Sequence, residues 1–494
     1  MKNEFCIPRA LLATALMTLT LAGCDSNTTS TTVKLPTSTP GAIKLHDPGV
    51  RLSESAVGAA LTGLDANYQK LFKAGLEEFN KQENVSDDGL GPTFNFNSCG
   101  GCHAYPDVGG SSPGPTKNNL KAINPQYIFW QTNLSKTNKI PSFIAGSDPE
   151  NPGLTPMREA RFVHLETDHT ILDGGVHALF TIEGLPGAET CTGLPQPNFE
   201  KAVAEQNIIF RIPTPVFGSG LIEQIPDTAI EENRQHEASQ KQTFGISGRS
   251  NITLSGHTRT ALANRNGNDG TIARFGWKAQ NKSLLVFAGE AYNVEMGVSN
   301  ELFPTERNET SACQTMNTPN DRTHPEKSDP MDVLSDIEKF AAYMRLLAPP
   351  TPSTSQPGGS ASIEKGRNLF KAVGCAYCHT PQFTTGKSDI PQLDRKPVNL
   401  YSDLLIHNMG PKLADGVTQG QASGDEFRTA PLWGLGQRIW FLHDGRTSDL
   451  IQAIDEHHSS DEGQNNSEAN YSVEKYNQLT TESKQDLLNF LRSL

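Results

Sequence analysis

The sequence predicts a mainly α-helical chain built from two related modules, the first enlarged by long loops and short strands. Three observations support this prediction. Each half opens with a helix that ends in Gly-x-x-x-Phe, at Gly75 and Phe79 and again at Gly366 and Phe370. Each half then carries a Cys-x-x-Cys-His pentapeptide, and each closes with an amphipathic helix of matching sequence. The repeated order indicates an internal duplication.

The two pentapeptides are Cys99-Gly100-Gly101-Cys102-His103 and Cys375-Ala376-Tyr377-Cys378-His379. This spacing is the attachment signature of c-type haem, in which both thiols bond to the porphyrin and the histidine ligates the iron. A zinc site would need further Cys or His residues close by, and a redox dithiol would leave both histidines unexplained. We therefore expect two covalently bound haem c groups, attached through Cys99, Cys102, Cys375 and Cys378 and ligated by His103 and His379.

Residues 1–24 predict a lipoprotein signal that ends in a lipobox. Lys2 and Arg9 accompany an apolar run too short to span a bilayer, and Leu21-Ala22-Gly23-Cys24 follows it. We expect Cys24 to carry a lipid, and an ordinary cleaved signal is the alternative. Residues 25–50 are rich in Ser, Thr and Pro, which predicts a flexible tether. The expected location is the periplasmic side of a bacterial cell envelope, with a lipid anchor in the membrane.

Charge and cysteine usage agree with an exported protein. The chain has 494 residues, and its 42 Lys and Arg against 55 Asp and Glu give a formal net charge of −13. Because no basic residues cluster, nucleic acid is not an expected partner. Once Cys6, Cys24 and the four haem cysteines are set aside, only Cys191 and Cys313 remain of the eight cysteines. An even remainder in an oxidising compartment predicts a disulfide.

A linker rich in Pro, Ser, Thr and Gly divides the chain at residues 349–360. We expect an N-terminal haem domain with a large insertion over 51–348 and a C-terminal cytochrome c domain over 361–494. The closing helix of the first domain is predicted to begin at Pro330 and to stop before Pro349. Residues 208–213 predict a short extended segment among the inserted loops. The order of helix, haem motif, loops and helix resembles the cytochrome c fold, in which the first and last helices cross at a glycine.

Longer stretches in both halves carry a wider resemblance. They are residues 89–95, 211–218, 274–279 and 295–297 in the first half and residues 402–410, 426–435 and 441–446 in the second. Together they resemble the di-haem oxidoreductase family, also labelled thiol oxidoreductases, which is related to the bacterial di-haem cytochrome c peroxidases. The resemblance implies reduction of hydrogen peroxide at the first haem, with electrons relayed through the second. It also implies a small redox donor protein, a cytochrome or a cupredoxin, as partner.

The same resemblance implies two catalytic residues. The peroxidase relatives carry an aromatic-Trp-Asp-Gly-Arg stretch and, further along, Asn-Pro-x-Glu-Met. Here Phe275-Gly276-Trp277 and Asn293-Val294-Glu295-Met296 are similar, although the Asp-Gly-Arg and the proline are missing, and the glutamine that usually precedes the glutamate has no clear counterpart. Trp277 is thereby implied as an electron relay between the haems, and Glu295 as the acid–base carboxylate over the first haem. A buried core tryptophan and a structural carboxylate are the alternatives.

The second haem is expected to be six-coordinate and to transfer electrons. Thr429 replaces the methionine that the peroxidase relatives place here, so the candidate second ligands are Met409, the only methionine of that domain, and His443. The remaining histidines of this domain are expected at the surface; they are His407, His457 and His458. A calcium ion between the domains, as in related peroxidases, has no clear ligand set in the sequence.

Two other functions stay open at this point. One is an electron-transfer cytochrome without a substrate of its own, which would hold two low-spin haems that never react with peroxide. The other is a di-haem oxygenase acting on a hydrophobic polymer, since relatives of this fold resemble rubber oxygenases.

Overall fold

The computed structural model describes residues 44–494 apart from residues 52–56, 116–119, 121, 166–167, 253–270, 306–310 and 460–465. The predicted signal, the lipobox with Cys24 and most of the predicted tether lie outside the described residues. The contacts of the chain place residues 44–494 in one compact unit, and the predicted boundary at 349–360 stays a prediction. Within the described ranges, no helix is long and apolar enough to cross a membrane.

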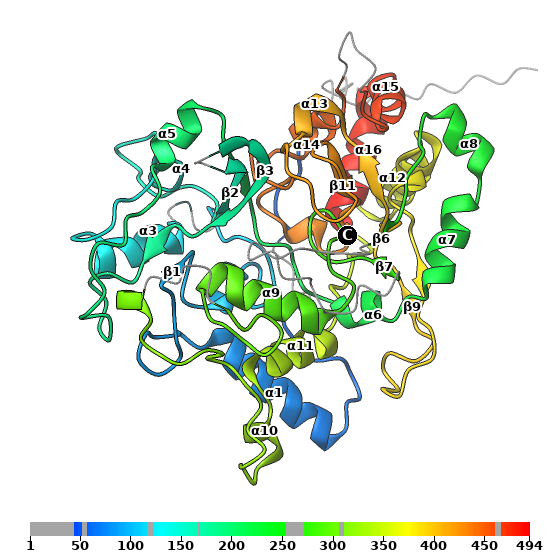
Figure 1. The fold of residues 1–494 in the computed structure, drawn as a ribbon. Helices are drawn as coiled ribbons and strands as arrows, with labels where there is room; N and C mark the ends of the chain where they lie inside the picture. The colour runs from blue at the N-terminus through cyan, green and yellow to red at the C-terminus, as the bar shows by residue number, and fades with distance from the viewer. Residues whose placement is uncertain are drawn as a thin grey trace, which may run out of the picture. The chain divides into compact units, whose positions relative to one another are not determined.

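The structure is mainly α, as predicted, with about 35% helix and 12% strand (Figure 1). The α-helices are α1 (Ala66–Asn80), α2 (Cys99–Cys102), α3 (Pro125–Phe129), α4 (Ser142–Ala145), α5 (Phe199–Ala204), α6 (Ser219–Glu223), α7 (Asp227–Gln235), α8 (Ala238–Thr243), α9 (Leu284–Met296), α10 (Pro330–Val333), α11 (Asp336–Leu346), α12 (Ser360–Ala372), α13 (Gly410–Leu413), α14 (Leu450–Glu456), α15 (Asn470–Asn477) and α16 (Thr481–Ser493). Short π- or 3₁₀-helical turns are η1 (Trp130–Leu134), η2 (Ser311–Cys313), η3 (Cys375–Tyr377) and η4 (Leu435–Gln437).

The strands are short and all their pairings are antiparallel. The largest sheet lies in the first half and has the order β3-β2-β5, formed by β3 (Asp168–His177), β2 (Glu159–Leu165) and β5 (Ile208–Arg211). The strand β5 confirms the extended segment predicted at 208–213. The remaining strands pair as β1 (Thr93–Phe94) with β4 (Phe180–Thr181), β6 (Asn251–Ile252) with β7 (Ile272–Ala273), β8 (Phe383–Thr384) with β9 (Pro397–Val398), and β10 (Ile406–Asn408) with β11 (Glu426–Arg428).

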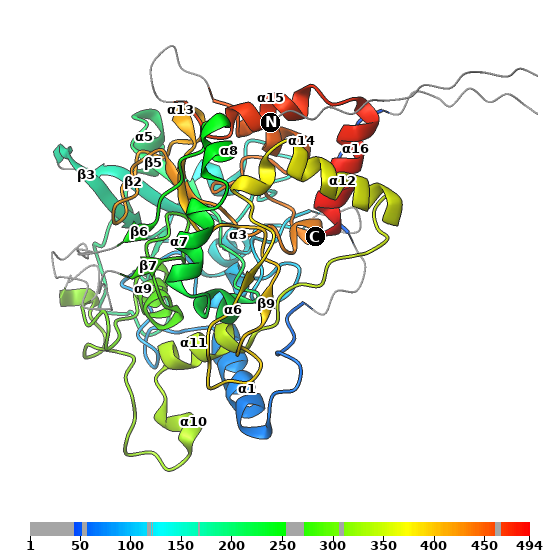
Figure 2. The same ribbon diagram turned by 90° about the vertical axis from the view of Figure 1, so that its right-hand side faces the viewer.

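Two helix pairs frame the two pentapeptides. In Figures 1 and 2, α1 packs against α11 and α12 packs against α16. The crossings need glycine, because a Cβ at Gly75 would lie 2.5 Å from the Lys339 carbonyl oxygen and one at Gly366 would lie 2.0 Å from that of Asp486. Both glycines belong to the Gly-x-x-x-Phe patterns, so the predicted close approach of opening and closing helices is present in each half.

The closing helix of the first half begins later than predicted. Pro330 does occupy a first-turn position, but in the separate short helix α10. A new helix, α11, starts after Ser335, whose backbone N–H donates to the Glu338 carboxylate at 3.0 Å in a capping box. Because a capping box satisfies the free N–H groups of a helix start, the chain begins a second helix here instead of continuing the first.

The predicted disulfide is confirmed. Cys191 and Cys313 are bonded to each other, and both are buried in the main hydrophobic core. That core extends from the first half to residues of the second half such as Phe383, Leu405 and Trp433. A second core cluster lies between α12, α14, α15 and α16. The two halves therefore share apolar packing as well as having their own helix pairs.

Candidate functional site

The first pentapeptide lies on the wall of a cavity of about 180 Å³. Cys99 and Cys102 begin and end the short helix α2, and His103 follows at its end. A large part of the remaining wall comes from α9, which contributes apolar residues together with Glu290 and Glu295. Further charged groups on this wall are Arg158, Glu159, Arg161 and Arg211.

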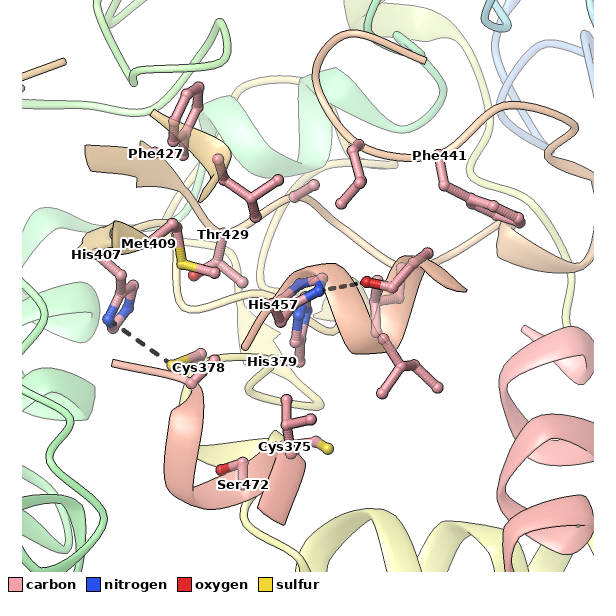
Figure 3. Close-up of a pocket in the computed structure, with 18 of the residues that line it drawn as sticks. Cys375, Cys378, His379, His407, Met409, Phe427, Thr429, Phe441, His457 and Ser472 are labelled. Atoms are coloured by element: carbon pink, nitrogen blue, oxygen red, sulfur yellow. Dashed lines mark hydrogen bonds between the residues drawn. The ribbon is translucent and has the colours of Figure 1, made fainter. Parts of the chain in front are cut away.

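The second pentapeptide lies on the wall of a more apolar cavity of about 220 Å³ (Figure 3). Cys375 and Cys378 lie next to His379, and the surrounding wall comes from α12, α14, α15 and α16 and from the loops between them. Cys99, Cys102, Cys375 and Cys378 are all free thiols. Both pentapeptides therefore present two thiols and an imidazole to a cavity.

The two motif histidines are held in the same way. The His103 ring donates from Nδ1 to the Gly110 carbonyl at 3.0 Å, and the His379 ring donates from Nδ1 to the Tyr401 carbonyl at 3.1 Å. A carbonyl can only accept, so Nδ1 carries the proton and Nε2 keeps its lone pair. Burial lowers the pKa of each ring to about 4, which keeps it neutral. A neutral imidazole oriented through Nδ1–H is the form that ligates metals.

His457 shares this arrangement, and its expected surface position is wrong. It lines the second cavity together with His379, and its Nδ1 donates to the Ala453 carbonyl at 2.7 Å (Figure 3). His457 is the C-cap of α14, three and seven residues after the helix positions of Ile454 and Leu450. Because Leu450 and Ala453 face the core, the helical period carries His457 to the same side. That spacing is the signal by which the sequence could have predicted it.

The predicted ligands Met409 and His443 also line the second cavity. The His443 ring stacks on Phe427 with ring centres 4.5 Å apart, and it meets the edge of the Trp277 ring at 6.4 Å. Burial lowers the pKa of His443 to about 4. The structure thus brings Met409, His443 and His457 to one cavity, and the choice among these three ligands stays open on position alone.

His407 was also expected at the surface, but it is only 3% exposed. Its Nε2 lies 2.9 Å from an Asp403 carboxylate oxygen and its Nδ1 lies 2.7 Å from one of Glu468. Burial alone would lower its pKa, but Cys378 and the Asp403 carboxylate raise the pKa well above its ordinary value. Since both ring nitrogens are engaged by carboxylates, His407 has no free nitrogen for a metal.

One arginine on the wall of the second cavity supports the fit of this cavity to a haem. Arg438 lines this cavity, and its guanidinium has no hydrogen-bond or ion-pair partner among the described residues. Burial lowers its pKa to about 10. An enclosed cation without a partner is costly, and a haem brings two propionate carboxylates that would relieve the cost. The cysteines, the two oriented histidines and this cation together fit the group that the pentapeptide predicts.

Trp277 lies on the walls of both cavities. Its indole Nε1–H donates to the Ile212 carbonyl at 3.0 Å, and its own carbonyl accepts from the Arg428 backbone N–H at 2.8 Å. The first contact comes from the first half of the chain and the second from the second half. This tryptophan therefore lines both cavities and is held by both halves of the chain, and its role as a relay stays a prediction.

A fully buried charge cluster holds the segment that carries Trp277. Lys278 Nζ lies 3.0 Å from one Asp415 carboxylate oxygen, and Arg211 Nη2 lies 2.6 Å from the other. Lys278 Nζ also donates to the Glu426 carbonyl at 2.9 Å and lies 4.0 Å from the centre of the Phe427 ring. Burial lowers the pKa of Lys278 to about 8 despite the Asp415 carboxylate. The cluster links the two halves of the chain at Lys278, the residue that follows Trp277.

Glu295 lies in the last turn of α9 and lines the first cavity. Its carboxylate accepts from the Asn95 side-chain amide at 3.0 Å, and the Asn95 backbone N–H donates to the Glu295 carbonyl at 2.7 Å. The Asn95 side chain is itself fixed, because its carbonyl oxygen accepts from the Leu179 N–H at 3.2 Å. Glu290, on the same helix, and Glu159 give the cavity two further carboxylates, which the sequence did not single out. The glutamine that had no clear counterpart in the sequence has three spatial candidates on this wall, Gln126, Gln280 and Gln419.

The comparisons with known proteins point to one family. The family model described as "Di-haem oxidoreductase, putative peroxidase" matches residues 194–494, which includes the second pentapeptide. No curated protein matches the chain. Among solved structures, the chain is similar to a hydrazine synthase of Kuenenia stuttgartiensis pressurised with xenon, at 18% identity and a TM-score of 0.23 over 42% of this chain and 61% of that one. It is also similar to a MauG-like protein associated with microbial copper homeostasis, at 18% identity and a TM-score of 0.29 over 57% of this chain and 90% of that one.

Proposed function

The chain belongs to the di-haem oxidoreductase, putative peroxidase family, and we propose that the reaction of this oxidoreductase is the reduction of hydrogen peroxide in the first cavity. The observation that carries the proposal is the pairing of an amide-held carboxylate, Glu295, with a tryptophan that reaches the second cavity. A small redox protein, a cytochrome or a cupredoxin, would supply the electrons through the second haem.

We further propose that both haems are covalently attached, through Cys99 and Cys102 in the first cavity and through Cys375 and Cys378 in the second. Each half would then be a cytochrome c-like module, which the glycine crossings of its opening and closing helices support. His103 and His379 would ligate the irons. When bound, the two haems supply the iron at which peroxide is reduced and the electrons that reduce it.

Reduction of one peroxide molecule to two water molecules takes two electrons and two protons. Glu295 would take the proton from one peroxide oxygen and return it to the oxygen that leaves as water. The Asn95 amide holds one carboxylate oxygen of Glu295, and the Glu295 side chain lines the cavity. Such positioning counts because a proton-transfer group must lie within hydrogen-bond reach of the atom that it serves.

The second cavity would supply electrons and not bind substrate. For this role its iron needs two protein ligands, and we propose His457 as the partner of His379. Its oriented Nδ1–H supports this choice, because it repeats the arrangement of both motif histidines. Trp277 would carry electrons between the cavities, held by contacts to both halves of the chain.

The test is Glu295→Gln, which keeps the size and the hydrogen bond to Asn95 but removes the base. Haem content and spectra should match those of the parent, while peroxide turnover with a reduced cytochrome should fall about 10²–10⁴-fold. Glu290→Gln is the matched comparison and should cost much less. Equal turnover in Glu295→Gln and parent would exclude Glu295 from the mechanism. A parent without peroxide turnover would favour the carrier or the oxygenase.

A further inference from the structure

Tyr292 lies on the wall of the first cavity and bonds to a buried acid. It belongs to α9, three residues before Glu295, and is 2% exposed. Its hydroxyl donates to a Glu83 carboxylate oxygen at 3.0 Å. One turn further along the same helix, Met296 Sδ lies 3.9 Å from Cys99 Sγ, an attachment point of the predicted haem. The phenol thus stands beside the first haem motif with a potential proton acceptor already in contact.

Glu83 connects this phenol to the protein surface. Its other carboxylate oxygen lies 3.1 Å from Lys81 Nζ, which also lies 2.7 Å from Asp88 and 3.1 Å from Glu78. The Lys81 side chain is 37% exposed. Its ammonium stands beside the carboxylates of Glu78, Glu83 and Asp336, which are close enough together to hold a metal ion. A line of polar groups therefore runs from the cavity to solvent.

We propose that Tyr292 is a redox-active tyrosine of the first cavity and that Glu83 receives its proton. In this step an oxidant in the cavity takes one electron from the phenol, the O–H bond breaks, and the proton passes to the Glu83 carboxylate. The products are a neutral tyrosyl radical and a carboxylic acid. One electron from a donor and the return of the same proton restore both groups. The inference rests on the proposed function, because hydrogen peroxide is the two-electron oxidant that would drive the step: the phenol would supply one of the two electrons and the redox donor protein the other.

A purely structural role would not need an acid at this position. Tyr343 shows the ordinary solution, since its buried hydroxyl donates to the Val108 carbonyl at 2.9 Å. A carbonyl satisfies the hydrogen bond but cannot take the proton of an oxidised phenol. Burying the Glu83 carboxylate is costly, and burial raises its pKa to about 8. The cost is understandable if the carboxylate acts as a base.

The experiment uses the protein with both haems in place and a photogenerated ruthenium(III) polypyridyl complex as a one-electron oxidant, without peroxide. Freeze-quenched samples of the parent should show a tyrosyl radical by electron paramagnetic resonance. Ring-deuterated tyrosine should narrow this signal, which separates it from a radical on Trp277. The signal should be lost in Tyr292→Phe and kept in the matched control Tyr343→Phe. An unchanged signal in Tyr292→Phe, or no tyrosyl signal in the parent, would overturn the proposal.

The pH dependence tests Glu83 itself. The titratable and charged groups that face it are Lys81, Glu78, Asp88, Asp336, Cys99 and Tyr292. Glu83 accepts a proton only when ionised, so radical yield in the parent should rise as the pH passes about 8. Glu83→Gln keeps an acceptor for the hydroxyl and should give little radical at any pH. A radical yield that does not change with pH in the parent would overturn the role of Glu83. Because the oxidant is not peroxide, a failure of this experiment is distinct from a failure of peroxide turnover.

Discussion

Replacing Asp415 with asparagine should destabilise the protein strongly, because Asp415 is the one carboxylate between two buried cations. Lys278 and Arg211 contact its two oxygens at 3.0 and 2.6 Å, and all three side chains are buried. Two positive charges and one negative charge leave the cluster with a net charge of +1. Asp415→Asn keeps the shape and raises that charge to +2 in the same buried volume.

The magnitude follows from what each cation loses. Lys278 has a pKa of about 8, so releasing its proton at pH 7 costs about 1.4 kcal/mol. This cost is the upper limit of what Lys278 contributes to the loss of unfolding free energy in Asp415→Asn. The lost charged hydrogen bond from Arg211 adds about 1.5–3 kcal/mol. The sum, about 3–4.5 kcal/mol, lies within the range of about 3–5 kcal/mol found when one partner of a buried pair is removed.

The assay is guanidinium unfolding of the haem-loaded protein, with the free energy taken from the first transition. Asp394→Asn is the matched control, because its pair with the exposed Arg395 lies at the surface and should contribute at most about 1 kcal/mol. Adding Lys278→Met to Asp415→Asn returns the net charge to +1 and should not reduce stability further. A loss below about 1 kcal/mol in Asp415→Asn, or a double variant less stable than the single one, would refute the reasoning.

The pH dependence of the same cluster has a defined sign. Between about 8 and the unfolded value of 10.5, the unfolded chain holds the Lys278 proton and the folded chain does not. The free energy of unfolding of the parent should therefore rise with pH across this window relative to Lys278→Met. At pH 9 Lys278 is already largely neutral in the folded parent. The loss of unfolding free energy in Asp415→Asn should then fall to the contribution of Arg211, about 1.5–3 kcal/mol.

Two further predictions concern the second half. His457→Gly should turn the second haem high-spin in visible and electron paramagnetic resonance spectra, while Met409→Leu and His443→Phe should leave it low-spin; the opposite pattern would return the ligand role to Met409 or His443. Gly366→Ala should cost about 1–3 kcal/mol of stability by guanidinium unfolding, because its Cβ would lie 2.0 Å from a backbone oxygen of α16. Gly386→Ala, whose Cβ would meet nothing nearer than 3.3 Å, should cost less, and equal losses would contradict the crossing argument.

The elements that the sequence predicted correctly are those that produce a pattern within a short stretch of sequence. Helical spacing and the Gly-x-x-x-Phe repeats predicted the paired helices, since a glycine at a crossing leaves its mark in the helix itself. Elimination among eight cysteines predicted the Cys191–Cys313 bond, which the structure confirms. The closing helix of the first half begins later than the first-turn proline at Pro330 predicts, because the capping box at Ser335 starts a separate helix, α11.

The side chains that the sequence placed wrongly are polar residues whose burial depends on distant partners. His407 is buried because Asp403 and Glu468 flank its ring, and Glu468 is 61 positions away. Polar type alone favours the surface, and only the fold supplies the compensating charge. The same limit applies to Lys278 and Asp415, which lie in different halves. His457 is the exception, because the helical period of α14 already pointed it inward.

The contacts around Trp277 combine a proposed role in electron transfer with a structural role in joining the two halves of the chain. The segment that would carry electrons between the cavities is also the segment that bonds the two halves of the chain, through the carbonyl of Trp277 and the ammonium of Lys278. A tryptophan that relays electrons must keep a fixed position relative to both redox centres, and a surface contact would not hold it. Buried charge pairs add little net stability compared with apolar packing, but they strongly penalise any shift that separates them. The Lys278–Asp415–Arg211 cluster thus constrains the position of Trp277, since any displacement of the segment that carries Trp277 would expose or unpair a buried charge.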